Sequence, residues 1–192
     1  MSKDTLMEFY SSIYSFDDYD YLISILRFNM APVIHKKKIG GLITLYNNKR
    51  NLKDLRTKHK QQINKILGLD FFELKETQNS ILILFYIDKK LKKRLKQNNI
   101  KNFLDNLGYK NCNTTYDYFK VLRSKLSVTC PFEIGVFLGY PLTDIISFNK
   151  GTRNYKCVGY WKCFNNKDKA LRTFLNYDNS KLTEMQNILK AV

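Results

Sequence analysis

The sequence predicts an α+β fold, with a mixed, mainly antiparallel sheet of four to five strands flanked by helices. Three observations support this class. Apolar residues recur at helical spacing near both ends of the chain, two β-rich runs separated by a polar turn lie in the middle, and residues 132–138 alternate between apolar and other side chains. No repeat or linker interrupts the 192 residues, so we expect a single domain, with an acidic helical segment (residues 1–30) before a basic α+β body (31–192).

The helices are predicted from their apolar periodicity and from capping residues. The first runs from Leu6 to Tyr14, and Asp17 or Asp18 is expected to cap a second helix that ends before Pro32. Further helices are expected over Asn51–Leu67, Asp88–Gln97, Asn102–Leu107, Tyr116–Leu126, Asp168–Phe174 and Leu182–Leu189.

The strands are predicted from runs of β-branched and aromatic residues. Leu42–Tyr46 is one strand, and Phe71–Thr77 and Ser80–Ile87 form a hairpin. Tyr155–Phe164 alternates as well, which predicts a strand with Lys156, Tyr160 and Lys162 on one face. Proteins that bind single-stranded nucleic acid use such a face, where the ring stacks on a base and the lysines meet phosphates. The alternative is a partly solvated face along which the lysine side chains lie.

Residues 132–141 are expected to be the central element. Period-two spacing predicts a strand that ends at Tyr140-Pro141 and is followed by a helix stopped by Gly151. Glycines at 135 and 139 leave one face bare, which indicates close packing, a bulge or a ligand. The motif residues proposed to line a pocket are Glu133, Gly135, Gly139, Tyr140, Asp144, Tyr160, Trp161 and Lys162.

This block resembles a bacterial domain family of unknown function whose signature is Pro-His-Glu-Ile-Gly-x-Phe-Leu-Gly-Tyr-Pro, followed by Gly-Tyr-Trp-Lys about twenty residues later. The matching residues are Pro131, Glu133, Ile134, Gly135, Phe137–Pro141, Asp144 and Gly159–Lys162. The similarity reaches back through Ile81–Tyr86 and Phe103–Tyr109, and weakly to Ala31-Pro32 and Lys38, so it covers most of the chain after residue 30. Phe132 replaces the family's histidine, and Lys36 and Ile39 replace a Gly and a Pro near Lys38, so no role of that histidine carries over. The resemblance implies a fold but no activity.

Charge is the strongest compositional feature. The formal net charge is +16 with a pI near 9.6, which favours polyanionic partners, although an AT-rich coding bias would also enrich lysine. Residues 1–30 carry two basic and five acidic side chains, so the excess lies in the rest of the chain. The predicted polyanion-binding residues are Lys36, Lys37, Lys38, Arg50, Lys53, Arg56, Lys60, Lys89, Lys92, Lys93, Arg94 and Lys96.

No cofactor, metal or catalytic signature is present. The four cysteines lack paired spacing and have only His35 and His59 as co-ligands, so we expect no zinc site and reduced thiols. Glu133 and Asp144 flank the glycine-bearing turn and could approach each other, but Glu133 could equally pair with Lys162 or Arg153, and we expect no enzyme. The first residues are amphipathic and the longest apolar run, 81–87, is short, so we expect a cytoplasmic protein without membrane contact.

The leading functional hypothesis is a non-enzymatic binding or regulatory protein whose lysine-rich surface engages nucleic acid or a nucleoprotein complex, for example as an anti-CRISPR-like inhibitor of an RNA-guided nuclease. The alternative is a cytosolic small-molecule or cofactor-binding accessory protein with a pocket at Gly135, Gly139 and Trp161. A third hypothesis is an assembly subunit that docks a protein partner through its acidic N-terminal helices.

Overall fold

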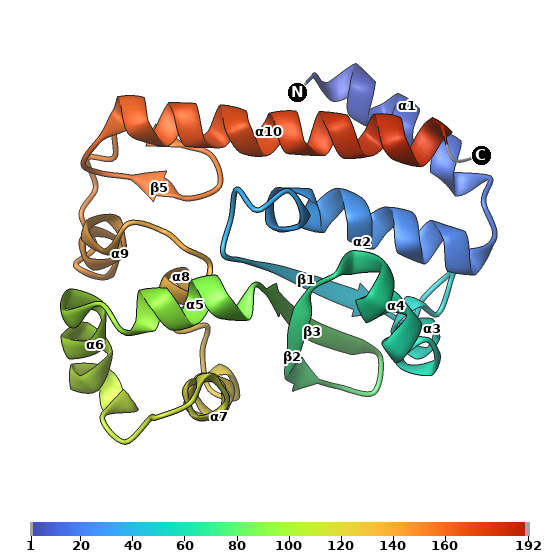
Figure 1. The fold of residues 1–192 in the computed structure, drawn as a ribbon. Coiled ribbons are helices and arrows are strands. Elements are labelled where there is room, and N and C mark those ends of the chain that lie inside the picture. Colours follow the sequence, from blue (N-terminus) through green and yellow to red (C-terminus); the bar gives the residue numbers. More distant parts are fainter. Residues whose placement is uncertain (1, 191–192) are drawn as a thin grey trace.

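The computed structural model describes residues 2–190, and their fold is α+β (Figure 1). Within that range lie ten α-helices, a three-stranded antiparallel sheet and a separate two-stranded hairpin. The predicted class is therefore confirmed, with the strands divided between two sheets. None of the helices in residues 2–190 has both the length and the apolarity needed to cross a lipid bilayer.

The main sheet has the order β1-β3-β2, with β1 Gly40–Tyr46, β2 Asp70–Glu76 and β3 Ser80–Tyr86. It confirms the three strands predicted in this part of the chain. Central strand β3 is buried on both faces: Ile81, Ile83 and Phe85 face one core, and Leu82, Leu84 and Tyr86 face the other. Such a strand reads as a continuous apolar run because neither face meets water.

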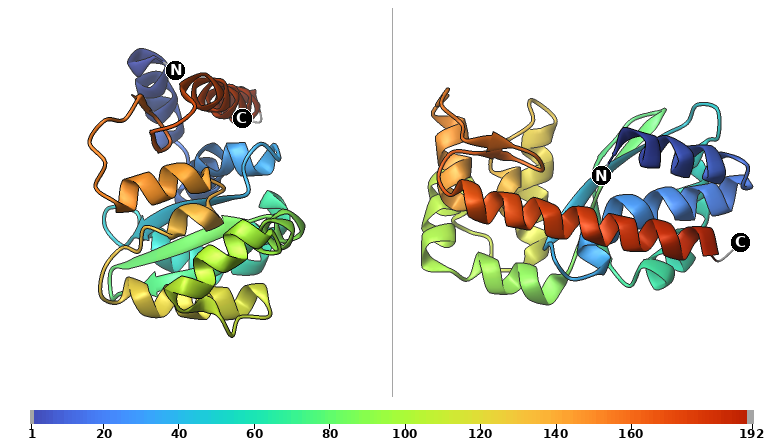
Figure 2. Two further views of the ribbon diagram at one scale, coloured as in Figure 1. Left: turned by 90° about the vertical axis from the view of Figure 1, so that its left-hand side faces the viewer. Right: turned by 90° about the horizontal axis from the view of Figure 1, so that it is seen from above.

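Helices cover both faces of this sheet (Figure 2, left). The first face packs against α2 (Asp18–Ile34), α3 (Leu52–Lys58) and α4 (Lys60–Leu67). The second packs against α5 (Asp88–Leu95), α6 (Asn98–Leu104), a π-helical turn (Asp105–Tyr109), α7 (Thr115–Leu126), α8 (Ile134–Phe137) and α9 (Leu142–Asn149).

Helix α10 (Lys167–Lys190) lies along the length of the molecule (Figure 2, right). Its first half packs Ala170 and Phe174 against the hairpin of β4 (Cys157–Val158) and β5 (Lys162–Cys163). Its second half adds Met185 and Ile188 to a small core formed with α1 (Lys3–Tyr14) and α2. A single continuous helix thus replaces the two short helices predicted for residues 168–189.

Two other predicted helices change their boundaries. Helix α2 continues through Pro32 to Ile34. Because Pro32 lies in the last turn, the one helical hydrogen bond lost is that to the carbonyl four residues earlier, and the Pro32 carbonyl itself accepts hydrogen bonds from the amides of Lys37 and Lys38. The helix predicted for 51–67 breaks at His59, whose φ of −105° leaves the helical region. The break lets α4 bury Ile63 and Leu67 in the core beneath α2.

The largest correction concerns residues 132–138, which form the short helix α8 and not a strand. Side chains on both sides of the expected strand are buried, including Val136, Phe137 and Leu138. A run this short and this apolar fits helix and strand alike, so its periodicity was not decisive.

Residues 155–164 also differ from the prediction of one strand. The chain turns back at Gly159–Trp161, so that Cys157 pairs with Cys163 and Val158 with Lys162. Lys156, Tyr160 and Lys162 therefore do not share one sheet face, and the base-stacking face proposed for them is absent.

Candidate functional site

Helix α8 ends in a tight turn that requires glycine. Tyr140 N–H donates to the Gly135 carbonyl at 2.8 Å, and Gly139 adopts a left-handed φ of +84°. This geometry is the usual glycine-dependent helix stop. A Cβ at Gly135 would lie 3.0–3.1 Å from Ile145 and Tyr140, so this glycine lets α9 approach closely. Both glycines thus serve local packing.

Asp144, at the start of α9, joins the two halves of the motif. Its carboxylate is 4% exposed and accepts four hydrogen bonds: Trp161 Nε1–H (2.9 Å), Phe164 N–H (3.0 Å), Asn165 N–H (3.1 Å) and Asn165 Nδ2–H (2.8 Å). A buried carboxylate needs such donors to offset the loss of hydration. Asp144 therefore holds the β4–β5 hairpin against α9.

Glu133 has a separate set of partners. Lys125 Nζ donates to its Oε1 at 2.6 Å, and the Tyr109 hydroxyl donates to the same oxygen at 3.3 Å. The partner is thus Lys125 and neither Lys162 nor Arg153, because Lys125 lies on α7, which packs beside the residue. Burial and the neighbouring carboxylate raise the pKa of Tyr109. Each acidic side chain of the motif is engaged in its own structural contact, and the two do not form a pair.

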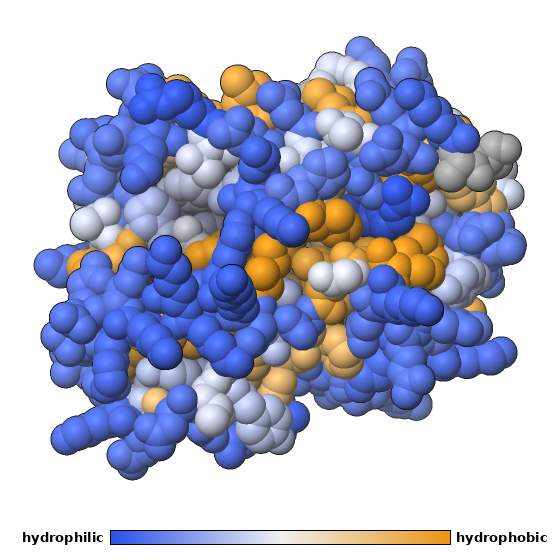
Figure 3. Space-filling view, viewed as in Figure 1, coloured by the Kyte–Doolittle hydropathy of each residue, from blue (hydrophilic) through white to orange (hydrophobic). Residues whose placement is uncertain are grey.

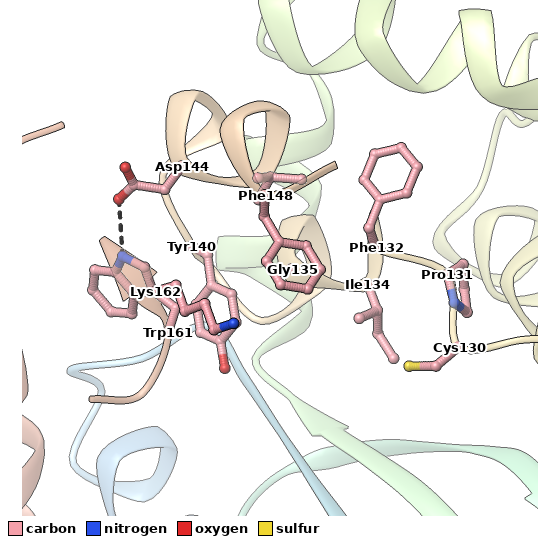
Figure 4. A pocket seen from close by; sticks show the side chains of 11 residues that line it. Cys130, Pro131, Phe132, Ile134, Gly135, Tyr140, Asp144, Phe148, Trp161 and Lys162 are labelled. Carbon is pink, nitrogen blue, oxygen red and sulfur yellow. Dashed lines mark hydrogen bonds between the residues drawn. The ribbon is translucent and has the colours of Figure 1, made fainter. Parts of the chain in front are cut away.

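The motif encloses an apolar cavity of about 340 Å³ (Figure 4). Aromatic side chains form most of its wall: Phe132, Tyr140, Phe148 and Trp161. Tyr140 and Trp161 pack with ring centroids 5.2 Å apart. The remaining lining residues are Cys130, Pro131, Ile134, Gly135, Asp144, Ile145 and Lys162. The volume lies within the range of about 300–1,000 Å³ typical of small-molecule sites.

The mouth of this cavity carries a single ammonium group. Lys162 is exposed, and its Nζ lies 5.7 Å from the centroid of the Phe148 ring and 5.8 Å from that of Tyr155. Among residues 2–190, no carboxylate lies within ion-pairing distance of Lys162. Since Asp144 is already satisfied, Lys162 is the free charge that an entering molecule would meet. Exposed Cys130 also lines the cavity.

Lys38 lies beside the motif, inside a group of tyrosines. Its Nζ is 5.4, 5.7 and 5.8 Å from the ring centroids of Tyr140, Tyr160 and Tyr177. Burial, with a smaller contribution from Lys181, lowers the pKa of Lys38 to about 8. The rings favour the cation, so they offset part of the desolvation cost. The early lysine and both motif blocks therefore meet in space, and the Lys38 ammonium lies against three tyrosine rings.

The predicted polyanion-binding residues do not form one surface. Those on and before α3 and α4 are committed to internal contacts: Arg50 to Asp18, Lys53 to Glu76, and Arg56 and Lys60 to Glu73. Arg56 is fully buried, and burial lowers its pKa. These four predicted residues are therefore held by internal ion pairs and do not extend a cationic surface shared with α5.

A smaller cationic patch remains on α5 and the adjacent loop. Lys90 Nζ donates to the Lys36 carbonyl, which brings the two segments together. Lys92 pairs with Asp88, and Arg94 points inward to the Tyr140 carbonyl. The exposed members without a carboxylate partner in the described chain are Lys36, Lys37, Lys89, Lys93 and Lys96, which we term the α5 patch. Hydrophilic side chains cover α5 and α6 in Figure 3.

Sequence analysis predicts part of this arrangement, since Tyr140, Tyr160 and Trp161 belong to the motif residues named there. It misses Phe132 and Phe148 of the aromatic wall. It also misses Tyr177 beside Lys38, which lies between the two helices predicted for residues 168–189. Within the described part of the chain, no three His, Cys, Asp or Glu side chains gather as a metal-binding group.

Fold and site together define an α+β protein with an aromatic-walled pocket. The short helices α8 and α9, the turn between them and the β4–β5 hairpin build this pocket. The chain belongs to the family described as "Protein of unknown function (DUF3793)", whose model matches residues 26–192. No curated protein and no solved structure matches the chain.

Proposed function

We propose that this protein is a non-enzymatic binding protein that holds a small planar aromatic molecule bearing an anionic group. The observation that carries the proposal is the aromatic-walled cavity, together with Lys162 at its mouth. Phe132, Phe148 and Trp161 supply flat apolar surface, which favours stacking over hydrogen-bonded recognition. The unpaired ammonium then selects for a carboxylate or similar group at one end of the ligand.

A binding role fits the acidic side chains better than catalysis does. General acid–base catalysis needs a carboxyl group that can reach a substrate and exchange a proton. Glu133 and Asp144 are 2% and 4% exposed, and each already accepts hydrogen bonds from neighbouring side chains.

The test compares naphthalene-2-carboxylate with the neutral naphthalene-2-carboxamide by isothermal titration calorimetry. We expect the acid to bind more tightly, and Lys162→Gln to remove that preference while leaving the amide unaffected. Phe148→Ala should weaken both; Phe148 is half exposed, so the variant should still fold. Lys150→Gln, a nearby exposed change, is the control. Binding of neither compound, or an equal effect of Lys150→Gln, would contradict the proposal.

A second candidate function is contact with a nucleic acid or nucleoprotein complex through the α5 patch. It is supported by five exposed lysines on two adjoining segments without carboxylate partners among residues 2–190. Lysines bind the sugar–phosphate backbone as point charges, so sequence-independent binding is expected, with three to five phosphates contacted at most. Inhibition of an RNA-guided nuclease is one form that such binding could take.

Fluorescence anisotropy with single-stranded RNA and DNA over a salt series tests this candidate. Replacing Lys89, Lys93 and Lys96 with Gln should lower the affinity about tenfold or more at low salt and flatten the salt dependence. The triple variant Lys49→Gln, Lys58→Gln and Lys65→Gln, at exposed positions on and before α3 and α4, is the charge-matched control. An equal loss in this control would show that only net charge matters.

A further inference from the structure

A second cavity of about 340 Å³ shares Trp161 and Asp144 with the first. It is enclosed by α5, by the turn before α9 and by the first turns of α10. Whereas the first cavity is aromatic, this one is rich in hydrogen-bond donors. Its polar lining residues are Arg94, Thr143, Asp144, Asn165, Asn166, Lys169, Thr173 and Tyr177.

Arg94 is the unexplained group in this cavity. It projects from α5 away from the α5 patch, and its Nη2 donates to the Tyr140 carbonyl. Its Nε is buried and has no hydrogen-bond partner. No carboxylate of residues 2–190 lies within ion-pairing distance, and burial lowers the pKa of the guanidinium. Arg94 is thus a partly buried cation without a counter-charge among the described residues, and an anion from solution that meets the accessible part of the guanidinium would supply one.

The surrounding groups favour an oxyanion. Lys169 brings a second cation, and no hydrogen bond to the Tyr177 hydroxyl is seen among the described residues. The one carboxylate in the wall, Asp144, already accepts four hydrogen bonds, from Trp161, Phe164 and Asn165. Asn166 uses its Oδ1 to accept from the Lys169 amide, which leaves its Nδ2–H₂ as a donor.

We propose that this cavity, which we term the Arg94 cavity, binds the phosphate group of a small phosphorylated molecule. Arg matches a phosphate with its planar fork, and a phosphate has three oxygens for the donors of Arg94, Lys169 and Tyr177. The cavity exceeds the size of free phosphate, so part of the attached molecule also fits. This site is independent of the proposed aromatic ligand and of the α5 patch.

The test is calorimetric titration at constant ionic strength with inorganic phosphate, ribose 5-phosphate, ribose and acetate. We expect the phosphate compounds to bind, with ribose 5-phosphate the tighter, and ribose and acetate to bind at least tenfold more weakly. Arg94→Gln should abolish binding. Lys169→Gln, at an exposed position that folding does not need, should weaken it about tenfold.

Two matched controls separate this site from the others. Lys93→Gln lies on the same helix but in the α5 patch and should leave phosphate binding unchanged. Phe148→Ala lies in the aromatic cavity and should also have no effect. Equal loss in Lys93→Gln would show surface binding of polyanions, equal binding of acetate would overturn the choice of phosphate, and no binding by any compound would overturn the site.

Discussion

At the scale of single residues, one buried carboxylate carries the connection between the two motif blocks. Both carboxylate oxygens of Asp144 accept hydrogen bonds from the hairpin and from the segment that follows it. The sequence placed Asp144 in the first turn of a helix, where an acidic side chain is favourable in any protein. Its partners lie 17 to 21 residues away, a separation that no local pattern encodes.

Asp144→Asn should destabilise the protein by about 3 kcal/mol, because one oxygen becomes a donor that faces other donors. Urea unfolding followed by circular dichroism measures this change. Glu8→Gln, an exposed acid-to-amide change on α1, should have an effect below about 0.5 kcal/mol. A loss for Asp144→Asn no larger than that of the control would refute the role of Asp144 as the link.

Lys38 should make stability depend on pH. Its pKa is about 8 in the folded protein and near 10.5 when unfolded, so the unfolded chain binds more protons between these values. The free energy of unfolding should therefore rise from about pH 8 towards pH 10.5, relative to Lys38→Met, whose curve lacks this contribution. The difference between the two curves cancels the tyrosine titrations that both proteins share. A constant difference would mean that the three rings fully compensate for burial.

The predicted charge roles show what residue-level patterns leave out. Arg56 has the same local sequence environment as an exposed helix cation, yet Glu73 on β2 and the ring of Phe71 enclose it. Whether a basic side chain is solvated or buried depends on tertiary neighbours. Charge counts alone therefore overestimated the cationic surface.

At the scale of elements, periodicity succeeded where each face has a distinct environment. The three strands of the main sheet and helix α7 lie within one or two residues of their predicted ranges, and α1 begins three residues before its predicted start. Periodicity failed at α8 and at the β4–β5 hairpin, where segments of two to four residues are too short for a period to be read. Glycine was the better signal at both sites.

Gly159→Ala should destabilise the hairpin by about 1–3 kcal/mol, since a Cβ there would lie 2.5 Å from the Phe174 ring on α10. Thermal unfolding measures the loss. The double variant with Phe174→Leu makes room for the methyl group, so the two changes should be less than additive. Full additivity would indicate that the close approach to Phe174 is not the cause.

At the scale of the whole molecule, α10 connects the hairpin region with the N-terminal helices. Near the end of α10, Glu184 accepts a hydrogen bond from Arg27 Nε at 2.6 Å, and its Oε2 lies 2.9 Å from His35 Nε2. Arg27 lies within α2, and His35 is the residue that caps its C-terminus. The sequence predicted helix at both ends of this segment but not its continuity, because residues 175–181 lack a clear apolar stripe. The single α+β fold was nevertheless predictable from composition and element order.

Glu184→Ala should loosen the second half of α10 while leaving the first half in place. Amide hydrogen exchange should increase in residues 182–190 and in α1, and stay unchanged around Phe174. Thr183→Ala, an exposed neighbour, is the control. Uniform loss of protection over the chain would show that α10 unfolds as a single unit with the rest of the protein.

Trp161 makes the intrinsic fluorescence of the protein sensitive to what both cavities hold. The chain has a single tryptophan, and it lines both the aromatic cavity and the Arg94 cavity. The intrinsic tryptophan fluorescence of the protein therefore comes from one side chain that both cavities contact. Aromatic guests would quench that emission through direct stacking, whereas a bound anion would shift its colour through the local electric field, so the unlabelled protein distinguishes the two kinds of occupancy.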